Sequence, residues 1–510
     1  MKSHSLKYLR IVFAVLFITA LSLVFVDFSG RAALWLAWTA KIQLVPALLA
    51  VNVTAIVILA ALTLVFGRVY CSVICPLGVS QDIVAWLRNR FSKKQKRKLG
   101  LYKYEKPRTM WRYIFLGLFA VLAVLGLLAV LPMSIAGIMD PYSAYGRIAG
   151  QAFVPAWRSA MGSLAEAQAS HGNYLFDKVP AATVNFNMAV AIVAAITFVV
   201  VAIFAFRTGR GYCNTVCPVG TILGFLSRFS LLRPEIDTDK CNRCGSCGRH
   251  CKAKCIDTKN HKIDYSRCVV CMDCLNNCSQ GAISYTLARR KAAPAAEEKT
   301  VDAGRRNFMV GTALATAAVA SAKVTDGGFA PIKKKQPHKG IEPSVPAGAV
   351  SLRHFRSHCT ACQLCVSECP NEVLRPSTSL DGFMQPVMVF TDGFCRPECN
   401  RCGTVCPTGA ITPVSVAQKS TIKTGTAKVD ASICISAAFG QTCGNCVRHC
   451  PAGAIKMIKQ DDGNMRPVVD ESYCIGCGSC EYHCPSGTAG QLSAKHAAIY
   501  VSGLDTHQTV

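Results

Sequence analysis

Most cysteines in this 510-residue chain fall into runs whose spacing suits metal ligation. Of 29 cysteines, 24 form six runs, and four of these runs read C-x2-C-x2-C-x3-C. In such a run three thiolates hold one [4Fe-4S] cluster and the fourth crosses to a neighbouring cluster. Zinc ribbons also use paired CxxC motifs, but they rarely carry a threefold run with the x3 step. The spacing therefore predicts [4Fe-4S] clusters rather than zinc or a disulfide framework.

The first two runs, CNRCGSCGRHC and CVVCMDCLNNC, predict a two-cluster ferredoxin segment. We assign one cluster to Cys241, Cys244, Cys247 and Cys278, and its neighbour to Cys268, Cys271, Cys274 and Cys251. Cys255 is left over and is expected to be a buried thiol. Lys252 and Ser279 follow the last cysteines of the two runs, where proline is usual. This change affects the rigidity of the loop and removes no ligand.

Four further runs follow residue 350, and each closes with x3-Cys-Pro. Two have widened first gaps, C-x3-C and C-x8-C, which indicate inserted loops and no missing ligand. The expected ligands of four clusters are Cys359, Cys362, Cys365, Cys369, Cys395, Cys399, Cys402, Cys406, Cys434, Cys443, Cys446, Cys450, Cys474, Cys477, Cys480 and Cys484. Adjacent and nested exchange of the last cysteines both stay open. The two segments together predict six [4Fe-4S] clusters.

Four other cysteines belong to an internal repeat, GRVYCSVICPLG and GRGYCNTVCPVG. Each copy follows an apolar stretch, so the repeat indicates a duplicated helical hairpin. Cys71, Cys75, Cys213 and Cys217 would then converge at one membrane face. Four soft ligands suit iron or copper. A shared metal site or redox-active pair and two separate structural dithiols are equally open.

Four stretches without formal charge are long enough, or nearly so, to cross a bilayer and position these repeats. They cover residues 11–26, 42–67, 113–139 and 179–206. The loop between residues 67 and 112 carries twelve Lys and Arg against two acids, whereas loop 140–178 has three of each sign. The positive-inside rule therefore places the N-terminus, the basic loop and the segment after residue 206 in the cytoplasm.

The net charge of +27 gathers in loops beside apolar segments, which is typical of a membrane protein resting on lipid rather than a nucleic-acid binder. The sequence thus predicts an α-helical membrane module of four spans, with a candidate fifth span at residues 304–322, plus α+β bacterial-ferredoxin-like [4Fe-4S] domains. The expected domains are a membrane module at 1–230, a two-cluster ferredoxin at 231–287, a linker at 288–350 and a four-cluster ferredoxin at 351–500.

The linker contains RRNFMVGTALATAAVASA, which is typical of a twin-arginine export signal. The features are Arg305, Arg306, Phe308 and a mildly apolar run ending at Ala322. A domain whose clusters are inserted in the cytoplasm must cross the membrane already folded, so the second ferredoxin segment is expected in the periplasm. The signal would stay as an anchor or be cut after Ala322. The alternative is a cytoplasmic Ala-rich helix, which the lysines at 333–335 favour.

Residues 1 to about 285, with the doubled GRxYCxxxCPxG motif and the two-cluster ferredoxin, resemble the NapH family of membrane quinol dehydrogenase subunits. Residues from about 303 onward resemble the MauM/NapG ferredoxins that accompany NapH. The resemblance implies a bacterial inner-membrane electron carrier that draws electrons from quinol and delivers them to a periplasmic reductase or cytochrome. Quinol oxidation needs a proton acceptor, and Asp140, Tyr142 and Arg147 are candidates for that pocket, or else a structural loop cap.

Two other functions stay open at this point. One is a redox assembly or maturation protein that uses the CxxxCP thiols on another metalloenzyme, and the other is a zinc-dependent nucleic-acid binder. No nucleotide-binding loop, flavin motif or Ser/His/Asp set stands out in the chain. The sequence therefore predicts no self-contained catalytic residues, and electrons must enter and leave through partners.

Overall fold

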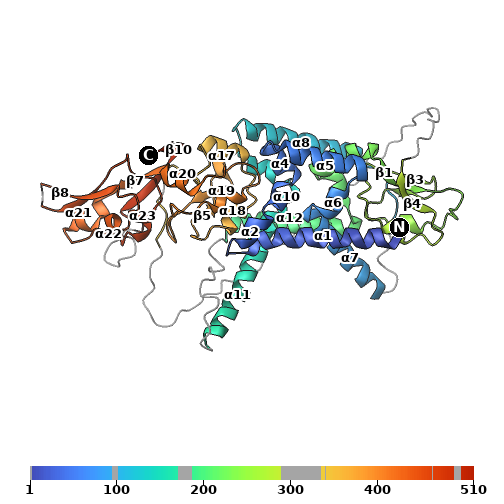
Figure 1. Ribbon diagram of the computed structural model, residues 1–510, viewed down its shortest axis with the longest axis horizontal. Coiled ribbons are helices and arrows are strands. Elements are labelled where there is room, and N and C mark those ends of the chain that lie inside the picture. Colours follow the sequence, from blue (N-terminus) through green and yellow to red (C-terminus); the bar gives the residue numbers. More distant parts are fainter. Residues whose placement is uncertain are drawn as a thin grey trace, which may run out of the picture.

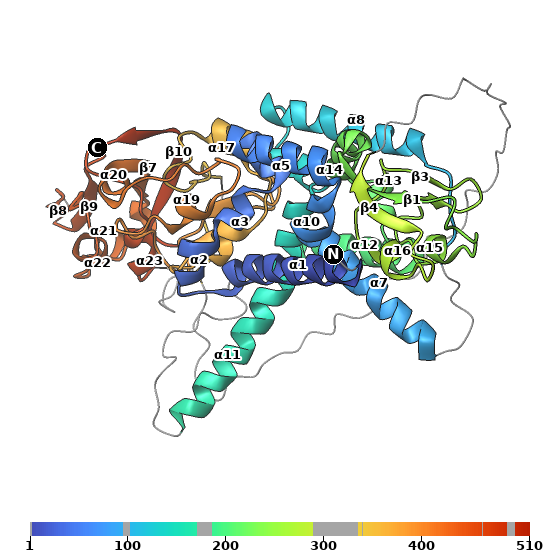
Figure 2. The same ribbon diagram turned by 45° about the vertical axis from the view of Figure 1, so that its right-hand side comes forward.

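The chain folds into a helical bundle with one small α+β unit at each end (Figure 1). The computed structural model describes residues 3–94, 102–170, 186–288, 335–338, 340–461, 463–486 and 495–510. The first ferredoxin segment lies beside the N-terminus, and the second lies at the opposite end of the bundle with the C-terminus (Figures 1 and 2). The export-like segment at residues 304–322 lies outside the described residues.

Three helices of the bundle are long and apolar enough to cross a membrane: α1 (Ser3–Val26), α8 (Thr109–Leu127) and α12 (Met188–Thr208). In their most apolar windows only 22%, 11% and 22% of the residues are buried inside the protein. Apolar surface of this extent is stable in contact with lipid and not with water. The bundle is therefore a membrane module.

The expected span at residues 42–67 is wrong as a continuous helix. It consists of α4 (Leu44–Leu49) and α5 (Val53–Phe66), separated by Val51 in the left-handed region and Asn52. The Asn52 side chain accepts a hydrogen bond from the Ala55 backbone N–H at 3.1 Å and so begins α5. At 1.5 Å per residue the 14 residues of α5 reach about 21 Å, short of a bilayer core of about 30 Å.

The other expected spans differ from the helices mainly at their ends. The first is longer, because α1 begins eight residues earlier than residue 11. The third is shorter, because α8 ends at Leu127 and a separate helix, α9 (Met133–Gly137), follows Pro132. Proline at this position supplies no backbone N–H and favours a break before a new first turn. The start of the fourth expected span, at residue 179, lies outside the described residues.

The first ferredoxin unit is built from two antiparallel strand pairs and two single-turn helices. The elements are β1 (Leu232–Ile236) with β4 (Ile283–Leu287), β2 (Ile256–Asp257) with β3 (Lys262–Ile263), α15 (Ser246–Arg249) and α16 (Asp273–Asn276). Cysteines and aliphatic side chains share its core. The unit is fixed to the bundle at the end of α5, where the Leu231 N–H donates to the Leu64 carbonyl at 2.8 Å.

The second ferredoxin unit has three strand pairs. They are β5 (Leu374–Pro376) with β6 (Pro386–Met388), β7 (Ile422–Val429) with β10 (Ile499–Thr509), and β8 (Ile455–Lys459) with β9 (Met465–Val469). Its helices are α17 (Leu352–His358), α18 (Leu364–Ser367), α19 (Arg401–Val405), α20 (Val416–Thr421), α21 (Ile435–Phe439), α22 (Asn445–Arg448) and α23 (Ser479–His483). One buried core runs through the unit and includes cysteines from all four runs.

The second unit docks on the end of the bundle formed by α10 (Pro141–Ile148) and its neighbours. The Ser143 and Thr360 hydroxyls are 2.8 Å apart, and Arg158 donates to the Ser367 carbonyl at 3.2 Å. Gly146 leaves room for the backbone here: a Cβ at this position would lie 2.3 Å from the Cys362 carbonyl oxygen. Close backbone contact of this kind fixes the cysteine loop on the bundle.

Candidate metal centres

In the first ferredoxin unit the cysteines line two separate cavities. One cavity is lined by Cys241, Cys244, Cys247 and Cys278. The other is lined by Cys251, Cys268, Cys271 and Cys274, together with Cys255. Each cavity thus combines three cysteines of one run with the last cysteine of the other, the exchange that a bacterial two-cluster ferredoxin needs. Cys255 is 1% exposed, with its sulfur 3.5 Å from that of Cys251.

In the second unit the exchange is between adjacent runs. One cavity is lined by Cys434, Cys443, Cys446 and Cys484, and another by Cys450, Cys474, Cys477 and Cys480. Burial raises the pKa of Cys365, and the nearby sulfurs of Cys359, Cys362 and Cys406 raise it further. Burial and the sulfurs of Cys395, Cys369 and Cys399 act in the same way on the pKa of Cys402. The first two runs therefore pair with each other, as do the last two.

The loops that carry the regular runs share positive φ angles on both sides of the second cysteine. In each C-x2-C-x2-C run, the residues just before and just after the second cysteine have positive φ: Arg243 and Gly245, Val270 and Met272, Ala361 and Gln363, Gly476 and Gly478. A β-branched residue such as Val270, with φ of 51°, rarely adopts this region. Such strain of about 1–3 kcal/mol per residue persists only where surrounding structure imposes it. The positive φ angles turn the three thiols of each loop toward one centre.

The arrangement fits a multi-iron cluster better than single ions. Among the described residues, which include every cysteine, no three His, Cys, Asp or Glu side chains lie close enough to hold one metal ion. Four thiols around a mononuclear zinc at about 2.3 Å would form such a group. A [4Fe-4S] cluster places an iron between each thiolate and the centre, so it holds its ligands farther apart.

The four cysteines of the internal repeat converge in the membrane module. Cys71, Cys75, Cys213 and Cys217 are between 3% and 4% exposed. Burial raises the pKa of Cys217, and the sulfurs of Cys213, Cys75 and Cys71 raise it further. Together they are referred to below as the four-thiol centre. The structure places the thiols of the two repeat copies near one another, an arrangement that suits a shared site.

The repeat is explained by contacts that cross from one copy to the other. Arg210 donates to the Cys71 carbonyl at 2.7 Å, and Arg68 donates to the Cys213 carbonyl at 3.3 Å. Within each copy the chain also packs closely. A Cβ on Gly78 would lie 2.2 Å from the Cys71 carbonyl oxygen, and a Cβ on Gly220 would lie 2.1 Å from the Cys213 carbonyl oxygen. The Arg and Gly of the motif are therefore needed for close packing around the thiols.

The Arg68 side chain places a positive charge beside the four-thiol centre. Its side chain is fully buried, and its guanidinium contacts Asn214 Oδ1 at 2.8 Å, the Ser266 carbonyl at 3.0 Å and Cys71 Sγ at 3.7 Å. No carboxylate pairs with Arg68 among the described residues. A buried charge is costly unless an opposite charge compensates it. Thiolates around a metal cluster would supply that negative charge.

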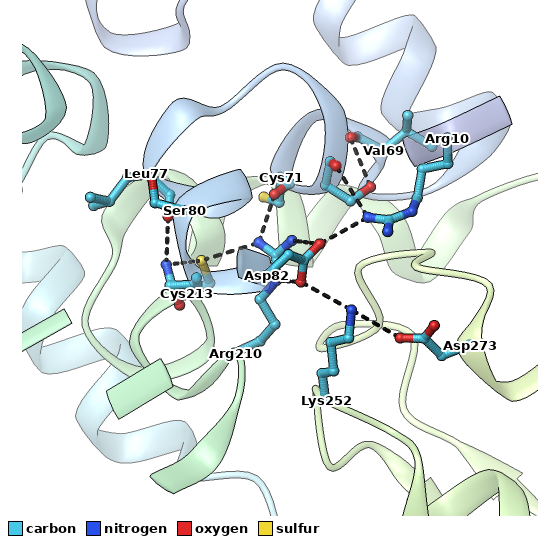
Figure 3. A network of polar contacts seen from close by, with 12 residues as sticks. Arg10, Val69, Cys71, Leu77, Ser80, Asp82, Arg210, Cys213, Lys252 and Asp273 are labelled. Atoms are coloured by element: carbon cyan, nitrogen blue, oxygen red, sulfur yellow. Dashed lines mark hydrogen bonds and ion pairs between the residues drawn. The ribbon is translucent and has the colours of Figure 1, made fainter. Parts of the chain in front are cut away.

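A network of ion pairs joins the four-thiol centre to the first ferredoxin unit (Figure 3). Asp82, on α7 (Pro76–Lys94), forms ion pairs with Arg10 at 2.8 Å, with Arg210 at 2.7 Å and with Lys252 at 3.4 Å. Lys252 also pairs with Asp273 at 3.0 Å. Burial alone would raise the pKa of Asp82, but the three cations outweigh it and hold that pKa well below its usual range.

The sequence did not single out this network. In the sequence, Asp82 is only one of two acids in a basic loop, and Arg10 lies at the edge of an apolar stretch. The available signal was the occurrence of Lys7 and Arg10 within an otherwise apolar helix. Charges in such helices usually face a partner or a cavity.

The residues considered for a quinol pocket lie elsewhere and are closed off. Asp140, Tyr142 and Arg147 are 1%, 0% and 0% exposed, beneath the docked second ferredoxin unit. Asp140 caps α10 by accepting from the Ser143 N–H at 2.8 Å, and Arg147 donates to the Gly137 carbonyl at 2.9 Å. These contacts are those of the loop cap, and they leave no opening for a lipid-soluble molecule at these side chains.

Comparison with known proteins supports iron–sulfur clusters in this chain. The sequence model of a 4Fe-4S binding domain matches residues 48–95 and 190–236, the two copies of the repeat. A 4Fe-4S dicluster domain matches residues 440–488, in the second ferredoxin unit. No solved structure matches.

Three relatives show how widely the likeness extends. The methylamine utilization ferredoxin-type protein MauM of Methylobacillus flagellatus is 33% identical over 26% of this chain and 59% of its own length. The ferredoxin-type protein NapH of Escherichia coli is 27% identical over 46% of this chain and 68% of its own length. An uncharacterized protein of Methanocaldococcus jannaschii is 37% identical over 15% of this chain and 30% of its own length.

The first relatives are matched over only 30% to 61% of their own length. Their ferredoxin-type character and the 4Fe-4S domains nevertheless agree with the membrane helices and the cysteine cavities. The resemblance expected from the sequence is confirmed: the relatives of the chain include the ferredoxin-type proteins NapH and MauM, and 4Fe-4S domain models match parts of it.

Proposed function

We propose that the chain relays electrons across a bacterial inner membrane, from quinol to a redox partner at the docked second ferredoxin unit. The path would consist of two clusters in the first unit, the four-thiol centre and four clusters in the second unit. The 24 cysteines of the six runs would hold six [4Fe-4S] clusters, and the four-thiol centre would hold a further iron–sulfur cluster. The match of a 4Fe-4S binding domain to both repeat copies supports that last assignment.

One observation carries this proposal: the candidate centres follow one another from end to end. Cys271 of the first unit shares a buried core with Cys71, Cys75 and Cys217. Ala144 and Ile148 of α10 belong to the same core, and Tyr142 and Tyr145 on that helix belong to a core that contains Cys362 of the second unit. Electron transfer between clusters requires such closely spaced sites.

The direction across the membrane rests on charge and on the arrangement of the units. The basic loop after residue 67 favours the cytoplasm, where the first unit would also lie. The second unit is at the other end of the bundle (Figure 1) and would face the periplasm, where a reductase or cytochrome could receive electrons.

The test uses the full-length protein in sealed liposomes, oriented with the second ferredoxin unit outward. A lipid-soluble quinol should bleach the visible absorbance of the clusters, and a membrane-impermeant oxidant added outside should then restore it. Dithionite gives the full extent of bleaching. A protein that dithionite reduces but quinol does not would contradict a quinol-driven relay.

A maturation protein would need thiols that reach a partner. The four thiols of the centre are no more than 4% exposed, so another protein's disulfide has no access to them. This burial favours a relay over the reduction of disulfides. A zinc-dependent nucleic-acid binder is disfavoured by the iron–sulfur relatives.

Replacing Cys217 with serine should remove the cluster of the four-thiol centre, a loss of about four iron atoms per chain. Reduction of the second unit by quinol should be lost with it, because the middle step of the path is missing. Iron and sulfide analysis checks the first effect, and cluster absorbance the second. The control is Cys255→Ala, which removes a buried thiol outside the proposed ligand sets and should keep the full iron content.

A further inference from the structure

A large cavity lies where α1, α7 and the first ferredoxin unit meet. Its volume is about 590 Å³. Such a volume is in the range of small-molecule sites, about 300–1,000 Å³. One side is apolar and comes from α1 and α7, with Ile11, Ala14, Val15, Val79, Ile83 and Trp86. The cavity is thus amphipathic, because the opposite side is charged.

The apolar side is continuous with the lipid-facing surface of the membrane module. Val15, Ile83 and Trp86 line the cavity and are 53%, 48% and 57% exposed. Val15 belongs to the apolar window of α1, which is only 22% buried. A ligand dissolved in the bilayer can therefore reach the cavity between α1 and α7 without crossing water.

The charged side is the ion-pair network between the two redox regions (Figure 3). Lys7, Arg10, Asp82, Lys252 and Asp273 all line the cavity. Lys252 adjoins Cys251, and Asp273 lies between Cys271 and Cys274 of the first unit. On the other side, the Arg210 that pairs with Asp82 donates to the carbonyl of Cys71. A ligand here would contact groups next to both sets of thiols.

We propose that this cavity holds the head group of a membrane quinol, with its ring oxygens at the charged side and its tail between α1 and α7. The inference rests on the proposed function and assigns its electron entry site. One quinol would give two electrons to two oxidised clusters, one electron each. Its two hydroxyl protons would leave to water through the polar side, where His250 lines the cavity, and quinone would remain.

A neutral dihydroxy ring suits this site better than a phospholipid head group. Three of the four basic side chains in the lining already share the two carboxylates: Lys7 pairs with Asp273 at 2.7 Å, Arg10 with Asp82 at 2.8 Å, and Lys252 with both. The fourth, Arg249, is exposed. An anionic phosphate would have to lie beside both carboxylates, at a cost in repulsion. Quinol hydroxyls can donate to those carboxylates, and the ring oxygens can accept from the cations.

The experiment measures binding and reduction separately, in the full-length protein with its clusters. Trp86 is the one tryptophan of the cavity lining, so a water-dispersed short-chain quinone should quench its fluorescence, and Trp86→Phe should remove that part of the quenching. Ala14→Phe should fill the apolar side and weaken quinone binding at least tenfold. Ile83→Phe narrows the same side from α7, in case the first variant fails to incorporate clusters. The control is Val124→Phe on α8, which is 54% exposed and remote from the cavity lining.

The expected result is that both cavity variants slow reduction by quinol at least tenfold, while dithionite reduces them as fully as the parent protein and Val124→Phe behaves like the parent. Normal quinol reduction in cavity variants that retain their clusters would overturn the site and leave the relay standing. If quinol fails to reduce the parent protein as well, the proposed function itself is wrong. Protection of Trp86 by phosphatidylglycerol vesicles, with no effect of quinone, would show a lipid site and overturn the proposal.

Discussion

Replacing Gly146 with alanine is expected to detach the first cysteine loop of the second ferredoxin unit from the membrane module. The new methyl group would lie 2.3 Å from the Cys362 carbonyl oxygen and 3.1 Å from the Phe25 ring, so the loop must move away from α10. Overpacking of this kind costs about 1–3 kcal/mol. Each 1.4 kcal/mol is tenfold, so the docked state should weaken by about ten- to hundredfold.

Two measurements check this result. Hydrogen exchange of residues 360–364 should speed up by a similar factor, and quinol should reduce the first unit while the second stays largely oxidised. Gly162→Ala is the matched control, because a Cβ at Gly162 meets nothing within 4 Å. Unchanged exchange in Gly146→Ala would mean that the loop is not held on α10 as described.

Replacing Asp82 with asparagine should cause the largest loss of stability of any single charge change in the described bundle. It leaves Arg10, Arg210 and Lys252 without the carboxylate that pairs with all three, and Arg210 is fully buried. Removing one partner of a buried pair costs about 3–5 kcal/mol, because the remaining charge is uncompensated. Denaturant unfolding in detergent, followed by the loss of cluster absorbance, measures the effect.

A second substitution separates charge from packing. In the Asp82→Asn background, Arg10→Met removes one of the uncompensated cations and should recover part of the loss. Asp461→Asn, at an exposed carboxylate, should change stability by less than about 0.5 kcal/mol. A cost as small as this control in Asp82→Asn would show that the network contributes little.

Local spacing groups the cysteines of the first unit in the same way as the linings of its two cavities do. Three expected ligands of each cluster lie within seven residues, so a short segment of sequence identifies them. The x3 step then identifies Cys278 as the expected fourth ligand. The exchange among the four later runs could not be predicted, because adjacent and nested pairing use the same spacing. It depends on how β7 pairs with β10 and how the runs pack in one core, which are long-range contacts.

Hydropathy predicted the membrane module but not its interruptions. A 42–67 segment without charge reads as one span, and only the local geometry at Val51 and Asn52 breaks it. The cavity could not be predicted from the sequence for a different reason. Its charged side combines Arg10, Asp82 and Lys252, which are more than 70 residues apart in sequence and meet only in the folded chain.

The crossed arginines have a consequence for biogenesis. During synthesis the first copy of the repeat emerges with Arg68 and Cys71 long before Cys213 and Arg210 exist, so neither copy can complete its surroundings alone. A nascent or truncated chain would therefore present an unneutralised guanidinium at the membrane edge, a feature that quality-control proteases could recognise. Cofactor insertion into the four-thiol centre would have to wait until translation has passed the second copy.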